Sequence, residues 1–256
     1  MIKIKNLSFS YYKGTKNVVN NLSFQIAKGK VNVLLGLNGC GKTTLIKLMA
    51  GLLTPVKGDI YYMDENLKSI SIAKRSKLFS YVSQRSNYND DYLVKEYLKY
   101  SFVNSLKFYE SPTEEQIKIV NEISSKFNFT QLLNKKMGQL SGGERQIITI
   151  AAAIIQDTPI ILLDEPTSAL DLKNQNTVLS TLNEIANKGT TIVLSSHNPN
   201  HALFLNANVM LMKDGNIVEY GNSKDIINVE NLKKVYGESI CFGDELPYRE
   251  ISFKRK

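Results

Sequence analysis

The spacing of apolar residues near the N-terminus is that of β-strands. Apolar and polar residues alternate over 2–5, 7–11 and 22–26, which is the two-residue period of a strand with one buried face. Residues 31–35 form a short, mostly apolar run that leads directly into Gly36, as is typical of a strand covered on both faces. We therefore predict that the chain begins with several strands.

The period becomes helical in the middle of the chain. Apolar residues have helical spacing over 42–50, 93–108 and 114–127, with polar residues at the positions between them. A further helix is predicted to start at Ser141, because Ser141 and Glu144 have the spacing of a capping box. The middle of the chain is therefore predicted to be largely helical.

Strand-like runs return after this helical stretch. Residues 160–163 and 191–195 are almost entirely apolar, and 172–187 between them has helical spacing. A hairpin is predicted over 209–219, with Asp-Gly-Asn at 214–216 as its turn. The whole pattern predicts an α/β core that is split in the sequence by a helical insert.

Composition places the chain among ordinary globular proteins. Of its 256 residues, 43% are hydrophobic and 22% are charged, which fits one large domain. No stretch approaches the ~18–20 continuous apolar residues of a membrane-spanning helix, and the N-terminus lacks the apolar core of a signal peptide. We therefore expect a cytoplasmic protein. The two cysteines, Cys40 and Cys241, do not make a disulfide framework, and no metal-ligand cluster is visible.

The net charge is +8 at pH 7 and the pI is near 9.2, which raises the question of an anionic partner. The lysines are scattered, however, and the only tight basic run is at 254–256. Nucleic-acid-binding domains gather their basic residues on one face or along one helix. We therefore expect no nucleic-acid partner, and weak attraction to an anionic membrane surface is the better interpretation of the charge.

A glycine-rich segment joins the predicted strand 31–35 to the predicted helix 42–50. Its glycines let backbone N–H groups face phosphate oxygens, and Lys42 adds a positive charge to the same oxygens. The Thr43 hydroxyl is a suitable ligand for Mg²⁺. The candidate nucleotide-binding residues of this segment are Gly36, Asn38, Gly39, Cys40, Gly41, Lys42, Thr43 and Thr44.

Two acidic residues, Asp164 and Glu165, come directly after the apolar run 160–163. A carboxylate at the end of a buried strand can hold Mg²⁺ through water, and the next carboxylate can orient the attacking water or accept its proton. We assign Asp164 to the metal and to nucleotide binding, and Glu165 to the water.

A second glycine-rich helix start, Leu-Ser-Gly-Gly-Glu at 140–144, precedes this acidic pair. Two glycines in a first helical turn cost about 1 kcal/mol each relative to alanine. A phosphate at the bare N–H groups and the positive end of the helix would offset this cost. Ser141, Gly142 and Gly143 are therefore further candidates for nucleotide binding.

In this order and combination, the motifs resemble those of the nucleotide-binding subunits of ATP-binding cassette (ABC) transporters, and the resemblance covers almost the whole chain. Residues 36–44 are similar to the family's first phosphate motif, 140–146 to its signature, and 168–171 to the loop after its catalytic glutamate. Gln84 resembles the residue of its glutamine loop, and His197 resembles its switch histidine.

The resemblance implies a P-loop NTPase core, an α/β fold with a mixed sheet flanked by helices. An N-terminal antiparallel β subdomain and an inserted α-helical subdomain complete a single cassette domain, 1–256. The implied boundaries are 1–88 and 158–222 for the core with its β subdomain, 89–157 for the helical subdomain, and 223–256 for a C-terminal helical tail.

The resemblance also implies roles for single residues, with ATP and Mg²⁺ as cofactors. Glu165, His197 and Gln84 are the implied catalytic residues: His197 contacts the γ-phosphate, and Gln84 senses the metal and the water. The implied metal residues are Thr43, Gln84 and Asp164, partly through water. An aromatic residue near the start of the chain usually stacks on adenine in this family. Tyr11 is the best match, and Tyr12 is the alternative.

The resemblance further implies partners. In this family the signature does not reach the phosphate loop of its own chain, so two subunits pack head to tail. Each ATP then lies between 36–44 of one subunit and 141–143 of the other. A homodimer is expected, with a heterodimer left open. The pair would sit peripherally on the cytoplasmic face of the cell membrane, bound to integral membrane permease subunits and acting indirectly with an extracytoplasmic substrate-binding protein.

The cargo is the least determined part of the prediction. Residues 197–203 and 231–237 look similar to subunits of importers for iron–siderophore complexes, haem or cobalamin, and iron-complex import is the favoured reading. Import of another metal or an oxyanion, and export, stay open. A soluble cassette ATPase acting on DNA or ribosomes is disfavoured, since the chain shows neither a heptad insertion nor a second cassette.

Overall fold

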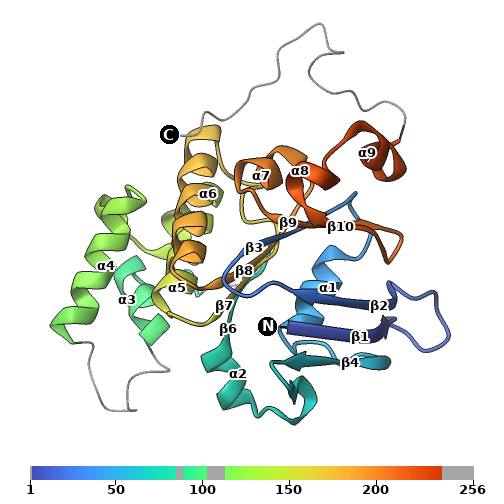
Figure 1. Ribbon diagram of the computed structural model, residues 1–256. Helices are drawn as coiled ribbons and strands as arrows, with labels where there is room; N and C mark the ends of the chain where they lie inside the picture. The colour runs from blue at the N-terminus through green and yellow to red at the C-terminus, as the bar shows by residue number, and fades with distance from the viewer. Residues whose placement is uncertain (1, 85–88, 103–112, 238–256) are drawn as a thin grey trace, which may run out of the picture.

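A computed structural model of the chain describes residues 2–84, 89–102 and 113–237 (Figure 1). Part of the predicted helix 93–108, Cys241 and the basic run 254–256 lie outside the described residues. Two β-sheets and the helices packed on them make up the fold.

The smaller sheet is antiparallel, with the strand order β2-β1-β4-β5. Its strands are β1 (Ile2–Phe9), β2 (Val19–Ile26), β4 (Lys57–Tyr62) and β5 (Glu65–Asn66). Ile2 pairs with Ile26 of β2, and Ile4 pairs with Ile60 of β4. These four side chains are buried, as the alternation of the sequence requires of one face of the sheet.

The central sheet has the strand order β10-β9-β3-β8-β7-β6. Its strands are β3 (Val31–Leu35), β6 (Phe79–Val82), β7 (Ile160–Leu163), β8 (Thr191–Ser196), β9 (Asn208–Lys213) and β10 (Asn216–Asn222). Neighbouring strands are parallel except for the β9–β10 hairpin. Because parallel strands all end at the same edge, the loops after β3, β6, β7 and β8 lie together.

Helices flank both sheets (Figure 1). On or near the core lie α1 (Lys42–Met49), α2 (Ile72–Leu78), α6 (Leu172–Asn187), α7 (Pro199–Phe204), α8 (Ser223–Ile226) and α9 (Val229–Tyr236). The insert contributes α3 (Val94–Lys99), α4 (Glu114–Lys126) and α5 (Gly142–Ile155). Helices α3 and α4 lie on the side of the central sheet away from the small sheet (Figure 1).

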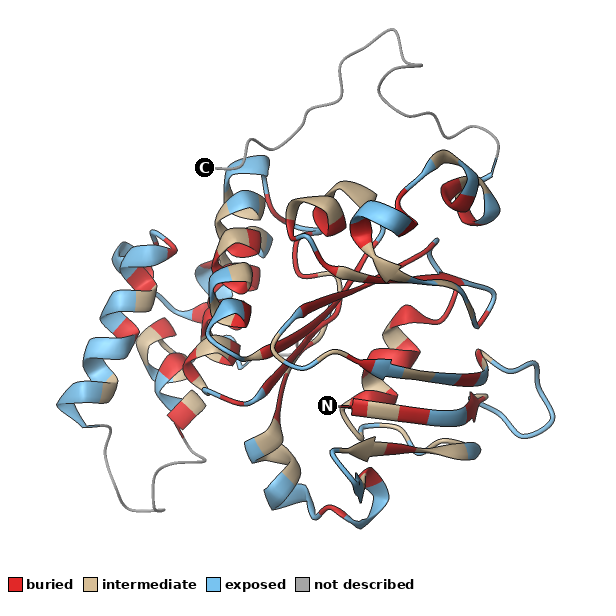
Figure 2. Cartoon of the chain, in the orientation of Figure 1, coloured by how far each residue is buried: buried red, intermediate tan, exposed pale blue. Residues whose placement is uncertain are grey.

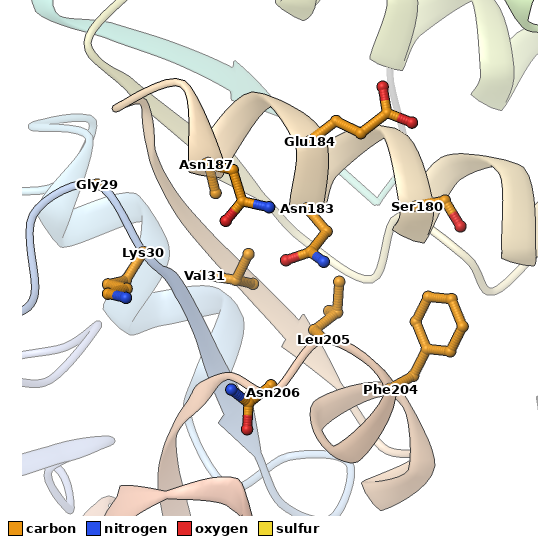
Figure 3. Close-up of a pocket in the computed structure, with 11 residues that line it drawn as sticks. Gly29, Lys30, Val31, Ser180, Asn183, Glu184, Asn187, Phe204, Leu205 and Asn206 are labelled. Atoms are coloured by element: carbon orange, nitrogen blue, oxygen red, sulfur yellow. The ribbon is translucent and has the colours of Figure 1, made fainter. Parts of the chain in front are cut away.

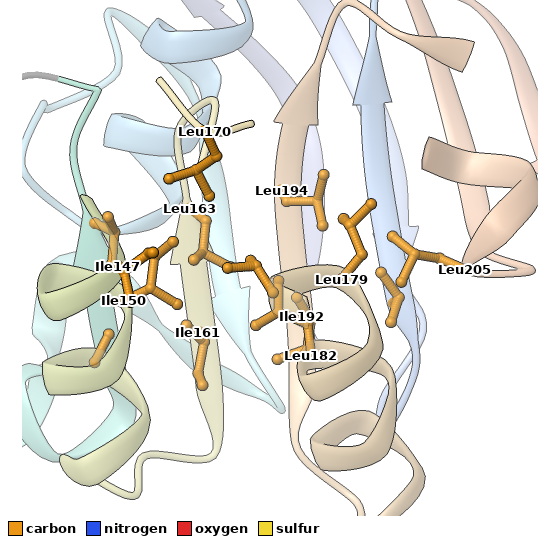
Figure 4. Close-up of a cluster of buried hydrophobic side chains, with 14 of the residues drawn as sticks. Ile147, Ile150, Ile161, Leu163, Leu170, Leu179, Leu182, Ile192, Leu194 and Leu205 are labelled. Carbon is orange, nitrogen blue, oxygen red and sulfur yellow. The ribbon is translucent and has the colours of Figure 1, made fainter. Parts of the chain in front are cut away.

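The central strands are largely buried (Figure 2). Alternate residues of these strands belong to two different cores, one on each face of the sheet. Ile161 and Leu163 of β7 and Ile192 and Leu194 of β8 pack with helices α5 and α6 (Figure 4). Leu162, one residue along β7, belongs to the second core, which contains α1 and the small sheet. Two-sided burial explains why these strands read as continuous apolar runs.

Several predicted elements are confirmed. The strand 31–35 and the helix 172–187 have the predicted bounds, and Ser141 caps α5 with Glu144 in a capping box. The hairpin is also confirmed, but Asn216 is the first residue of β10 and not part of the turn. Within this turn, Asp214 and Gly215 have positive φ, 45° and 80°, as the two central residues of a type I′ turn require.

Other details differ from the prediction. Strand β1 ends at Phe9, so the alternation through residue 11 runs past the strand and Tyr11 lies in the loop behind it. The predicted helix 93–108 is α3 followed by a 3₁₀ turn at Tyr100–Phe102 within the described residues. Strands β4, β5 and β6 and helix α2 had no prediction. Helix α2 has no buried apolar stripe, since it buries no residue at all.

Candidate functional site

The loop 36–41 joins β3 to α1 at the carboxyl edge of the central sheet. Two of its glycines have no room for a side chain. A Cβ at Gly36 would lie 2.4 Å from the Met212 carbonyl oxygen, and a Cβ at Gly41 would lie 2.6 Å from the Val18 carbonyl oxygen. Gly41 is also left-handed, with φ 109°, and caps α1 without a side-chain hydrogen bond. The first-turn N–H groups of α1 are thus free of side-chain acceptors, which suits an anion.

Lys42 begins α1 and is 5% exposed. Its Nζ donates to the carbonyl oxygens of Gly36 and Leu37, at 2.8 and 3.0 Å, and lies 3.9 Å from Oε1 of Glu165. The ammonium group is therefore held inside the loop by hydrogen bonds, between its backbone and an acidic side chain. A phosphate in the loop would take the same donor, as the predicted role of Lys42 requires.

Asp164 lies just beyond β7 and is 1% exposed. Its Oδ1 accepts a hydrogen bond from the Ser195 hydroxyl at 2.7 Å, whereas its Oδ2 is buried with no partner among the described residues. A buried carboxylate oxygen without a donor is costly unless a ligand satisfies it. A divalent cation with its water shell is such a ligand, so Asp164 fits the predicted Mg²⁺.

Glu165 is the point where the site residues meet. Gln84 Nε2 donates to Glu165 Oε2 at 3.1 Å, and His197 Nδ1 lies 3.8 Å from the same oxygen. Lys42 approaches the other oxygen, Oε1. The structure thus gathers around one carboxylate three residues that the sequence places far apart.

The backbone of Glu165 is unusual as well. Its φ is +48°, a left-handed conformation that L-residues other than Asn and Asp seldom adopt and that costs of order 1–3 kcal/mol. Its N–H donates to the Ser195 hydroxyl at 2.8 Å. Such strain is concentrated at functional sites, which agrees with the role predicted for this residue.

The second glycine-rich helix start lies at the surface. The Ser141 hydroxyl accepts from the Glu144 N–H at 3.2 Å, and Glu144 Oε2 accepts from the Ser141 N–H at 2.7 Å. Hydrogen bonding of the Glu144 carboxylate with the Ser141 backbone, and to a smaller degree with its side chain, lowers the pKa of Glu144. A Cβ at Gly142 would meet nothing within 4 Å, so this turn faces open space. Among the described residues, no hydrogen bond or ion pair connects 141–144 with 36–44.

Tyr11, in the loop after β1, contacts helix α1, which follows the glycine-rich loop 36–41. Its hydroxyl lies 3.0 Å from the Thr44 Oγ1, and its ring packs edge-on against Phe9 with centroids 5.0 Å apart. Tyr11 is 53% exposed and Tyr12 is 76% exposed. The fixed ring beside α1 favours Tyr11 over Tyr12 for stacking on a base, and its role stays a prediction.

Two further residues near the site, Ser195 and Tyr236, had no predicted role. The Tyr236 hydroxyl, from helix α9, donates to the His197 carbonyl oxygen at 3.4 Å. Burial raises the pKa of Tyr236, and a hydrogen bond from the Gly36 backbone opposes this. Helix α9 therefore connects the histidine loop to the glycine loop. No motif marks such a contact, because it depends on how distant segments pack.

His201, on helix α7, is buried. Its Nδ1 lies 3.0 Å from the Ser196 hydroxyl. Burial, with a smaller effect of the neighbouring His197, lowers the pKa of His201 to about 4. The ring is therefore neutral near pH 7 and serves as a hydrogen-bonding core residue.

A hollow of about 600 Å³ lies at the opposite edge of the central sheet (Figure 3). Its lining residues include Lys30 before β3, Asn183 and Asn187 on α6, and Asn206 after α7. None of the predicted site residues belongs to it. The candidate site is therefore the carboxyl edge, where chemically distinct groups converge, and not this hollow.

A family model for the ABC transporter matches residues 19–168. The chain belongs to the ABC transporter family. It is an ABC-type ATPase, a subunit that hydrolyses ATP to power transport. The fold is that of the family's P-loop cassettes.

Known ABC proteins resemble this one over nearly its whole length. A probable iron chelatin transport ATP-binding protein of Helicobacter pylori is 30% identical, covering 96% of this chain and 98% of that protein. The molybdate import ATP-binding protein MolC of Haemophilus influenzae is 32% identical, covering 98% and 94%.

Two solved structures show the same likeness. An inward-facing putative metal-chelate type ABC transporter has a TM-score of 0.76 at 31% identity, covering 92% of this chain and 88% of that one. The dimeric bacterial ABC transporter cassette MJ0796 has a TM-score of 0.80 at 27% identity, covering 87% and 99%. Among the described residues, no helix of this ABC ATPase is both long and apolar enough to cross a bilayer.

Proposed function

We propose that this ABC ATPase hydrolyses Mg²⁺–ATP at the carboxyl edge of the central sheet and so powers the import of a metal–chelate complex. The observation that carries the site assignment is the convergence of Gln84, His197 and Lys42 on Glu165, next to the partnerless oxygen of Asp164. A carboxylate held in this way can orient a water molecule and accept its proton.

The remaining roles extend the same proposal. The loop 36–41 and Lys42 would hold the phosphates, Thr43 and Asp164 would hold the metal, and Gln84 would contact the metal's water. The metal, when bound, neutralises charge on the phosphate oxygens. His197 is 58% exposed on its side chain, so it is free to contact the terminal phosphate.

A second copy of the chain completes the site. Residues 141–143 present a helix start with a bare glycine to open space, and the loop 36–44 exposes Asn38 and Gly39. In a head-to-tail pair, each exposed half would face the other across a nucleotide. The similarity to a dimeric cassette supports this arrangement.

The membrane partner docks at the seam between the core and the helical insert. A groove of about 210 Å³ lies there, lined by Tyr81, Tyr97, Tyr100, Thr149, Ala152 and Gln156. We call it the seam groove. Tyr100 is 57% exposed at its rim, which suits an aromatic anchor for a partner helix. Gln84 follows Tyr81 closely in the sequence, so movement around Glu165 can reach the groove. The partner would be a permease, with this subunit at the cytoplasmic face of the membrane.

The cargo assignment has two candidates. The iron chelatin and metal-chelate descriptions of similar proteins favour a ferric chelate. The molybdate importer, which is similar to the same degree, favours an oxyanion. None of these residues would touch the cargo, because they serve the nucleotide or the membrane partner.

Purification of the tagged chain from membranes of its host tests the proposal. We expect a polytopic membrane protein to co-purify, whereas recovery of ribosomes or DNA in its place would contradict a transport role. In liposomes containing the purified complex, ATPase activity should rise when the external binding protein carries a ferric chelate. A rise with molybdate alone would shift the assignment to the oxyanion.

A further inference from the structure

One buried hydroxyl touches both acidic residues of the site. Ser195 lies near the end of β8 and is 0% exposed. Its Oγ donates to Asp164 Oδ1 at 2.7 Å and accepts from the Glu165 N–H at 2.8 Å. Leu194, the preceding residue, pairs with Leu163 of β7, so the sheet register brings Ser195 beside the acidic pair.

The bond to Asp164 makes its two carboxylate oxygens different. Oδ1 is engaged by Ser195, and Oδ2 is buried without a partner in the described part of the chain. The Asp164 N–H donates in turn to the Val82 carbonyl oxygen at 2.9 Å. The last torsion of an aspartate is broad and roughly two-fold. A hydrogen bond to one oxygen therefore holds the carboxylate in one orientation and leaves the other oxygen available to a ligand.

The bond to Glu165 acts on the backbone. Glu165 is left-handed, with φ +48°, and lies beyond the end of β7 at Leu163, so its N–H needs an acceptor outside the strand ladder. Ser195 provides it. The left-handed turn in turn sets the direction of the Glu165 side chain, whose Oε2 accepts from Gln84. Without the hydroxyl, this part-buried N–H would lack its partner where the backbone is already strained.

We propose that Ser195 is a positioning residue for ATP hydrolysis: its hydroxyl presents Asp164 Oδ2 to the divalent cation and holds the Glu165 backbone in its left-handed turn. The proposal rests on the roles proposed above for Asp164 and Glu165. It requires a hydroxyl at position 195 and assigns no contact between Ser195 and the nucleotide.

The primary test is Mn²⁺ binding to the Ser195→Ala variant with ATP, followed by electron paramagnetic resonance. Loss of an outer-shell partner typically costs about 10- to 100-fold in metal affinity or activity. We therefore expect Mn²⁺ affinity and turnover each to fall by about 10-fold or more. ATP binding in the absence of a divalent cation should stay unchanged, since Ser195 does not touch the glycine loop.

A matched pair separates the hydroxyl from the packing. Ser195→Thr and Ser195→Val add side chains of nearly the same shape at a fully buried position, and only threonine retains the hydroxyl. Threonine should bind Mn²⁺ with markedly higher affinity than valine, by about 10-fold. Equal Mn²⁺ affinity in this pair would overturn the proposal, even if Ser195→Ala does not fold.

Ser80→Ala is the control for general stability. Ser80 is 1% exposed on β6 and accepts from the Thr158 hydroxyl at 3.0 Å. It lies near the amino end of β6, away from the carboxyl edge that carries Asp164 and Glu165. It should lower the melting temperature and leave Mn²⁺ affinity unchanged. If Ser195→Ala matches Ser80→Ala in Mn²⁺ affinity and turnover, the positioning role is wrong.

Two further variants distinguish a wrong role for Ser195 from a wrong site assignment. Asp164→Asn and Glu165→Gln should both be inactive whether or not Ser195 has a positioning role. Full turnover in these two variants would remove the site assignment itself. Inactivity of both, together with an unaffected Ser195→Ala, would remove only the role of Ser195.

Discussion

The two edges of the central sheet are built from the same strands but treat buried polar groups in opposite ways. At the amino edge, Asn32 is 0% exposed, and its Nδ2 donates to the carbonyl oxygens of Ala27, Lys30 and Ile192 at 3.0 to 3.2 Å. At the carboxyl edge, Asp164 Oδ2 has no partner in the described residues, and Glu165 has a strained backbone.

This difference indicates that the unfavourable groups are concentrated at the carboxyl edge, where a ligand could stabilise them. The buried Asn32 amide is fully hydrogen-bonded within the protein. It therefore stabilises the start of β3 and needs no ligand. The partnerless oxygen of Asp164 and the left-handed backbone of Glu165 are both unfavourable in the protein alone. A bound cation would satisfy Asp164, and an ordered water would bind to Glu165. The contrast supports the carboxyl edge as the proposed site.

Substitution at the carboxyl edge should have the largest effect on binding. Lys42→Met removes the ammonium group that charge-assisted hydrogen bonds hold in the loop. Such bonds contribute about 1.5–3 kcal/mol, so ATP affinity should fall by up to about 100-fold, as measured by isothermal titration calorimetry. Unchanged affinity would contradict the phosphate-loop assignment.

Substitution at the amino edge should affect stability and spare the chemistry. Asn32→Leu leaves three backbone carbonyls and the Ala27 N–H, which donates to Asn32 Oδ1 at 3.3 Å, without their buried partner. We expect a loss of about 2–3 kcal/mol in the free energy of unfolding by urea. ATP affinity of the folded protein should be unchanged, and a loss of affinity comparable to that of Lys42→Met would erase the contrast between the edges.

The third prediction concerns acid stability near the carboxyl edge. The folded-state pKa of His201 is lowered to about 4 by burial, whereas the unfolded chain has the ordinary value near 6.5. Between these values the unfolded state binds the extra proton, so stability is retained above pH 6.5 and is lost as the pH falls toward 4. From pH 6.5 to pH 5 the contribution is about 2 kcal/mol.

Denaturation curves at several pH values check this. The variant His201→Gln keeps a side-chain donor and acceptor but does not titrate, so its curve should lose this part of the acid dependence. An acid dependence identical to that of the wild type would show that His201 is not the responsible group.

Elements with strong local signals could be predicted from the sequence, and elements held by tertiary contacts could not. Helix α6 has the predicted bounds because Asp171 caps it and its apolar stripe is regular. Strand β4 is mostly half-exposed and is defined by its pairing with β1, which no local pattern reveals.

The same reasoning applies to the site. The sequence placed Lys42 and Glu165 by motif, since the chemistry requires those residue types at those spacings. Ser195 reads as an ordinary residue of a buried strand, and its significance arises only from the register between β7 and β8. Tyr236 depends on the docking of α9, which likewise has no local signal.

The central claim is that one ATP is held between the phosphate loop of one subunit and residues 141–143 of a second. The most direct test is sedimentation of the Glu165→Gln variant with and without Mg²⁺–ATP. This variant should retain ATP binding and turn over at least about 100-fold more slowly, because a general base is lost. We predict a stable dimer with ATP and a monomer without it. A variant that binds ATP and remains monomeric at every protein concentration would contradict the account.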